Sequence, residues 1–149
     1  MEENVSKHLV KLPLDAINES VEASPQVGYT NEEIESVLKD LKEAVEKGTY
    51  KPCMPTVANP SLSDDYLFDQ NDERFVLNDL TKDNFVGKVR DLSKGSHART
   101  EQGYPLEFLY VFKYPCRLVC RESDKSSKEE NVLIYIKINN RKPPIQLYF

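Results

Sequence analysis

The sequence contains no tryptophan, few glycines and no long apolar run. A transmembrane helix needs roughly 20 predominantly apolar residues in succession, so no membrane-spanning helix is predicted. Residues 1–5 are acidic and lack the basic region and apolar region with which a secretory signal peptide begins. We therefore expect a cytoplasmic protein with no membrane partner.

Cysteine and histidine are also scarce. The three cysteines, Cys53, Cys116 and Cys120, are an odd number, and a tetrahedral zinc site usually takes four protein ligands. On one strand Cys116 and Cys120 would lie about 13 Å apart, too far for a disulfide. His8 and His97 have no partner at ligand spacing. We expect reduced cysteines used for packing, and neither a metal site nor a cofactor.

Charge is unevenly distributed along the 149 residues, whose net charge is −5. Residues 1–79 contain 7 Lys/Arg against 17 Asp/Glu, whereas residues 80–149 contain 13 against 8. This asymmetry indicates a second half that meets a polyanion, or chance clustering with no partner.

One helix is clearly marked, over residues 31–47. Thr30 and Glu33 form a capping-box pattern, and Gly48 is suited to end the helix in the left-handed conformation. An apolar stripe repeats at three and four residues, which is typical of a helix packed on a core. The stripe consists of Ile34, Val37, Leu38, Leu41 and Val45.

Other segments before residue 105 carry weaker signals. We expect a short helix at 14–23 and helical turns at 61–67 and 82–89. Residues 51–61 should be irregular and 91–104 a loop, and residues 75–80 form either a helix or a strand.

After residue 105 the apolar period becomes two, which predicts strands at 106–113, 117–121, 132–138 and 145–149. Pro115 indicates a sheet edge or a bulge, and residues 122–130 form a polar hairpin loop. The order of elements predicts an α+β fold with N-terminal helices packed on a C-terminal antiparallel sheet of three or four strands. Residues 30–149 form one domain, and 1–29 are an arm, a linker or part of the fold.

The basic second half contains the residue types for cutting RNA without a metal ion. When the 2′-hydroxyl attacks the adjacent phosphate, the site needs a base, an acid for the leaving oxygen and cations for the developing charge. A histidine ordinarily titrates near neutrality, and tyrosine can stack on a base. The alternative is a solvated face without a ligand. The candidates are Lys88, Arg90, Lys94, His97, Arg99, Glu107, Tyr135 and Lys137.

Several short segments, in order and spacing, resemble the MqsR family of toxins in the broader RelE-like group. These are the helix 32–50 ending in EKGTY, FVLNDLTKDNF at 75–85, LEFLYVF at 106–112, the strand 132–138 with YIKI at 135–138, and the closing strand 145–149. The resemblance implies a RelE-like α+β fold, cleavage of messenger RNA without a metal, growth inhibition, and silencing by a cognate antitoxin or immunity protein.

Carried over by position, the family's functional residues fall on Lys88, on Glu107 where the family has glutamine, and on Tyr135. We therefore expect a metal-independent endoribonuclease, in which the base is Glu107 or His97 and Lys88 and Tyr135 are also catalytic. Phosphate would be held by Lys88, Arg90 and Arg99, and Tyr135 with Lys137 would complete the site. The RNA-binding residues would be Arg90, Lys94, Arg99 and Lys137.

The alternative is a non-enzymatic interaction module, such as an immunity or antitoxin-like protein or a phage accessory protein. Overall acidity and the lack of a tight catalytic motif favour this second hypothesis.

Overall fold

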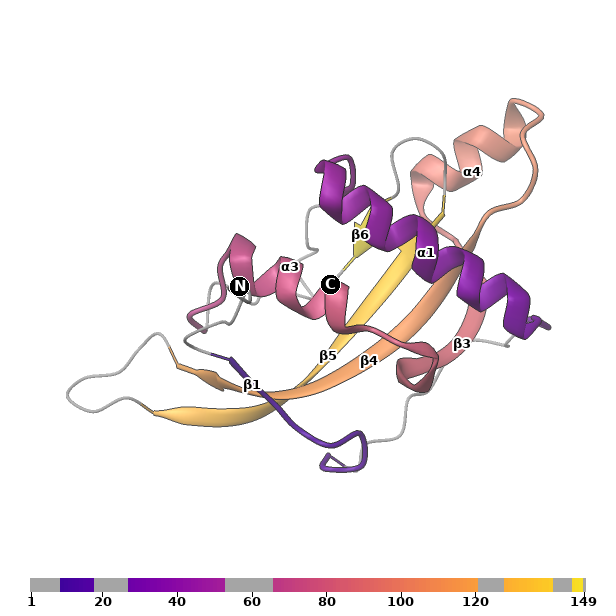
Figure 1. Ribbon diagram of the computed structural model, residues 1–149. Coiled ribbons are helices and arrows are strands. Elements are labelled where there is room, and N and C mark those ends of the chain that lie inside the picture. The colour runs from indigo at the N-terminus through magenta and orange to yellow at the C-terminus, as the bar shows by residue number, and fades with distance from the viewer. Residues whose placement is uncertain (1–8, 18–26, 53–65, 121–127, 141–145, 149) are drawn as a thin grey trace.

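The structure is a computed structural model and describes residues 9–17, 27–52, 66–120, 128–140 and 146–148. It is an α+β fold in two layers, with helices α1 and α3 lying across one face of a twisted sheet (Figure 1). The elements, in chain order, are β1 (Leu9–Lys11), α1 (Asn31–Lys47), β2 (Lys51–Pro52), α3 (Gln70–Asp79), the 3₁₀ turn η1 (Lys82–Asn84), β3 (Phe85–Arg90), α4 (Lys94–Glu101), β4 (Phe108–Val119), β5 (Glu129–Asn139) and β6 (Gln146–Tyr148).

The sheet is built around the long hairpin of β4 and β5, whose register places Phe112 opposite Ile136. The strand order is β1-β4-β5-β6-β2, and β3 pairs with β4. All described pairs are antiparallel except β2 with β6, which is parallel. The predicted α+β class is confirmed. The described sheet has six strands instead of three or four, because the short strands β1, β2 and β3 join it.

Pro115 lies within β4, so the predicted strands 106–113 and 117–121 are one continuous element. Two different strands pair with one edge of β4: β3 pairs at residues 108–112 and β1 at residues 116–118. The carbonyl oxygen of Pro115 faces the same edge and accepts from the Leu12 N–H at 3.1 Å. Pro115 therefore lies between the two partner strands, where its missing N–H breaks no ladder bond.

The predicted helix 31–47 is confirmed with both ends. The Thr30 hydroxyl accepts from the Glu33 N–H at 3.1 Å, and the Glu33 carboxylate accepts from the Thr30 N–H at 3.3 Å. Gly48 ends the helix with a φ of 69°, in the left-handed region that glycine tolerates best. Every residue of the predicted stripe is buried, and Leu41 has no exposed surface.

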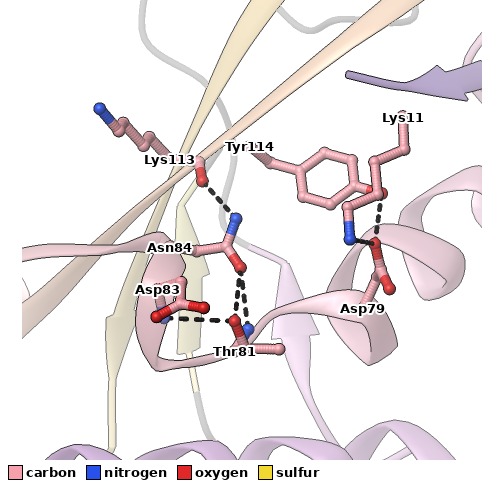
Figure 2. A network of polar contacts seen from close by, with 7 residues as sticks. All are labelled: Lys11, Asp79, Thr81, Asp83, Asn84, Lys113 and Tyr114. Atoms are coloured by element: carbon pink, nitrogen blue, oxygen red, sulfur yellow. Dashed lines mark hydrogen bonds and ion pairs between the residues drawn. The ribbon is translucent and has the colours of Figure 1, made fainter. Parts of the chain in front are cut away.

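The core lies between the helices and the even-numbered residues of β4 and β5. These side chains are Phe112, Tyr114, Cys116, Leu118, Ile134, Ile136 and Ile138, all buried. Figure 2 shows a polar network at its margin. The Tyr114 hydroxyl donates to Asp79 at the end of α3 at 2.8 Å, and Lys11 of β1 pairs with the same carboxylate at 2.9 Å. Burial, and then this hydrogen bond, raise the pKa of Tyr114 well above its ordinary value.

Several weaker predictions are decided by local capping. Residues 75–80, left open between helix and strand, belong mostly to α3, which begins where Asp69 and Asp72 form a reciprocal capping box. The turn predicted over 82–89 is limited to η1, after which the chain continues as β3. Phe85 is half-buried and packs against the core.

The prediction of a loop at 91–104 is wrong, because residues 94–101 form α4. Residues 14–17 form turns instead of helix, and the rest of 14–23 lies outside the described residues. Within 51–61, residues 51–52 form β2. Residues 53–65, which include Cys53, and residues 121–127 lie outside the described residues. At the N-terminal end, β1 pairs with β4 and Val27 bridges Lys88, so residues 9–11 and Val27 join the sheet.

Candidate functional site

A pocket of about 130 Å³ opens at the end of the sheet where β3 finishes and β4 begins. Helix α4 forms one wall, because it lies in the connection between these two strands (Figure 1). The lining residues are Arg90, Asp91, Leu92, Ser96, His97, Thr100, Leu106 and Glu107. Three of the eight sequence candidates, Arg90, His97 and Glu107, therefore meet in one place.

A buried polar cluster of Asp91, Glu107 and Asn139 adjoins the pocket. The amide nitrogen of Asn139 donates to Asp91 Oδ2 at 2.7 Å and to Glu107 Oε1 at 3.3 Å. The backbone carbonyl of Glu107 accepts from the Asp91 N–H at 3.0 Å. Asp91 and Asn139 are buried, and the Glu107 side chain is only 12% exposed. Because buried carboxylates need such donors, this cluster fixes the orientation of Glu107.

Helix α4 is held by polar contacts, since its eight residues include only one apolar side chain, Ala98. The Asp91 carboxylate accepts from the Ser93 N–H at 2.9 Å, and the Ser93 hydroxyl caps the helix by accepting from the Ser96 N–H at 3.3 Å. One turn later the Thr100 hydroxyl donates to the Ser96 carbonyl at 3.1 Å. The wall of the pocket therefore depends on the same Asp91 that contacts Asn139.

Two further side chains of α4 carry candidate chemistry. His97 Nε2 lies 3.2 Å from Glu101, and its side chain is 73% exposed. Arg99 reaches from α4 to Glu107, with 3.0 Å between Nε and Oε2, and its guanidinium lies 4.2 Å from the centre of the Tyr104 ring. Arg99 is thus a fourth candidate that is connected to the pocket, through its bond to the lining residue Glu107.

Lys88 lies apart from this group. Its ammonium pairs with Glu33 of α1 and lies 4.6 Å from the centre of the Phe108 ring, so it faces the helices. The Tyr110 hydroxyl donates to the same carboxylate oxygen at 2.5 Å. The hydrogen bonds from Lys88 and Tyr110 hold the pKa of Glu33 below its ordinary value of 4.5. Burial and the bond to Glu33 raise the pKa of Tyr110.

The remaining candidates occupy other places. Tyr135 and Lys137 alternate with the buried isoleucines of β5 and therefore belong to the sheet face opposite α1. Lys94 is the exposed first residue of α4. The structure does not bring these three side chains and Lys88 into the pocket.

Asp91, Ser96 and Asn139 were not among the sequence candidates, although they build the site. The sequence did contain a signal for the N-terminal end of α4, because Asp91-Leu92-Ser93 has the spacing of an Asx turn followed by a helix cap. Asn139 gave no signal, since its partners are 48 and 32 residues away along the chain.

Comparisons with known proteins found no matching family model, no similar curated protein and no similar solved structure. Within the described ranges, no three His, Cys, Asp or Glu side chains gather as a metal site would require. In the same ranges, no helix combines the length and the apolar character needed to cross a membrane.

Proposed function

We propose that this chain is a metal-independent endoribonuclease whose cutting centre is the α4 pocket. The observation that supports the proposal is the convergence of an acid–base pair with cations. His97 and Glu107 line one small pocket together with Arg90, and Arg99 is bonded directly to Glu107. These groups come from three separate segments of the chain.

The proposed reaction needs only these groups. Glu107 takes the proton from a ribose 2′-hydroxyl, whose oxygen then attacks the adjacent phosphorus. Protonated His97, beside the Glu101 carboxylate, gives a proton to the departing 5′-oxygen. The products are a 2′,3′-cyclic phosphate and a 5′-hydroxyl.

Arg99 and Arg90 would stabilise the negative charge that grows on the phosphate oxygens. The ion pair with Glu107 uses Nε of Arg99, so the two terminal nitrogen atoms of the guanidinium remain to contact a phosphate. Lys88 is assigned a structural role, because its partner Glu33 belongs to the capping box of α1.

Membership of the MqsR-like toxins is part of the same proposal. The sequence resemblance and the α+β fold with helices on an antiparallel sheet support it. The substrate would then be messenger RNA, activity would arrest growth, and an antitoxin or immunity protein would silence the chain.

The decisive variant is His97→Ala, because the exposed His97 side chain can be removed without disturbing the core. The purified protein should cleave RNA in the presence of EDTA, and the variant should be at least about 100-fold slower. Lys39→Ala, on the exposed face of α1, is the matched control and should cleave at the wild-type rate. Equal cleavage rates for His97→Ala and wild type would rule out His97 as the acid and would refute this mechanism.

A non-enzymatic interaction module is the second candidate, supported by the internal pairing of charges. Glu33 pairs with Lys88 and Glu107 with Arg99, so both ion pairs also serve as anchors between elements. Such a module would leave RNA intact, be harmless when expressed alone, and recover a protein partner in a pull-down.

A further inference from the structure

The two faces of the β4–β5 hairpin differ in character. Tyr110 contacts Glu33 of α1 and Tyr114 contacts Asp79 of α3, so even-numbered residues of β4 face the helices. Side chains alternate along a strand, so odd-numbered residues belong to the opposite face. Figure 2 shows this directly, because Lys113 and Tyr114 extend to different sides of β4.

The opposite face carries cations around an aromatic ring. Lys113 is paired directly across from Tyr135, and Lys137 is two residues further along β5. Arg117, on the same side of β4, donates to Asn131 of β5 at 3.1 Å. Lys137 is exposed, and Lys113, Arg117 and Tyr135 are partly exposed.

The carboxylates on this face lie away from its centre. Among the described odd-numbered positions of β4 and β5, the acidic side chain is Glu129, paired opposite Val119 at the far end of the hairpin. At the opposite end of the hairpin, the odd-numbered residues of β5 continue from Lys137 to Asn139, which contacts Glu107 of the pocket. At 3.3 Å per residue, Tyr135 lies about 13 Å from Asn139 along β5.

We propose that this sheet face binds single-stranded RNA that runs on from the α4 pocket. Its occupant is argued from charge complementarity, since three cations suit successive phosphates and Tyr135 offers a surface on which a base can stack. Tyr135 and Lys137 thereby bind the substrate instead of reacting with it. The inference rests on the proposed function in taking RNA as the ligand, but binding and cleavage are measured separately.

The binding experiment uses a fluorescein-labelled 12-nucleotide 2′-O-methyl RNA, which lacks the attacking hydroxyl and stays intact. Anisotropy titrations over a range of salt should give a slope of log K against log salt near −2, because each phosphate contact contributes about −0.7. Lys113→Gln with Lys137→Gln should weaken binding at least tenfold and reduce the slope to about −0.7. Lys39→Gln with Lys47→Gln makes the same change in net charge on exposed positions of α1 and should bind as wild type.

The aromatic contact is tested separately. Tyr135→Ala should weaken binding roughly 5- to 150-fold, and Tyr135→Phe should retain it, since stacking needs only the ring. Equal losses in the face variant and the α1 control would overturn the inference, as would binding to anionic phospholipid vesicles but not to RNA. If the wild type binds RNA tightly, the face variants lose that binding and ordinary RNA is not cleaved, the RNA-binding surface is supported and the ribonuclease proposal is rejected.

Discussion

Removing the Asn139 side chain should destabilise the fold and release α4. In Asn139→Ala, the Asp91 carboxylate loses a hydrogen bond of 2.7 Å while remaining only 6% exposed. A hydrogen bond to a charged group contributes about 1.5–3 kcal/mol, and the longer bond to Glu107, at 3.3 Å, adds a smaller amount. We therefore expect the free energy of unfolding to fall by about 2–4 kcal/mol.

Urea denaturation followed by circular dichroism measures this loss, with Asn131→Ala as the matched control. Asn131, on the same strand as Asn139, is exposed and bonds Arg117 of the neighbouring strand β4, so its substitution should change stability by about 0.5 kcal/mol or less. A double-mutant cycle with Asp91→Ala should give a coupling of about 1.5–3 kcal/mol. A loss below about 1 kcal/mol, or no coupling, would refute the role assigned to the buried cluster.

Three further predictions concern the rest of the fold. The hydrogen bond from Lys88 lowers the folded-state pKa of Glu33, so the stability contributed by this pair is complete above about pH 4.5 and is lost as pH falls through the folded-state pKa. In urea titrations between about pH 6 and 3, the free energy of unfolding of Glu33→Gln should therefore fall less steeply than that of the wild type. Leu41→Ala should destabilise by about 2–5 kcal/mol, whereas Leu92→Ala, at a 74% exposed position, should change stability little, and equal melting shifts would contradict the described core. Gly48→Ala should cost about 1 kcal/mol at its positive φ, and an unchanged melting temperature would argue against this helix end.

The strongly patterned elements were predictable because local chemistry and packing agree there. The stripe from Ile34 to Val45 is the buried side of α1, and the alternation of 132–138 is the two-faced strand β5. Residues 70–79 were harder to assign because their apolar run is short. The start of α3 depends instead on the capping box between Asp69 and Asp72, which precedes that run.

Helix α4 could not be found from periodicity, because polar contacts hold it instead of an apolar stripe. Its anchors are the bond from the Ser93 N–H to Asp91 and the Arg99–Glu107 pair, which became recognisable only once β3 and β4 were placed side by side. The strand assignment around Pro115 was wrong for a related reason. A proline is tolerated inside β4 because it lies in the gap between β1 and β3, and the local sequence does not reveal that gap.

Four of the eight site candidates were grouped by the fold for similarly non-local reasons. Glu107 and Arg99 meet because α4 folds back over the start of β4. Lys88 was drawn instead to Glu33, which is 55 residues away along the chain. Residue type alone therefore identified a basic region but not which side chains share a site.

The most direct test of the central claim is cleavage of an oligonucleotide that is 2′-O-methylated everywhere except at one ribose, with EDTA present. The ribonuclease mechanism predicts one cut, on the 3′ side of that ribose, and mass spectrometry should find a 2′,3′-cyclic phosphate beside a 5′-hydroxyl fragment. The His97→Ala variant should leave the oligonucleotide whole over the same time. Intact oligonucleotides across all choices of the base at that ribose, from folded wild-type protein, would contradict the claim and favour the interaction module.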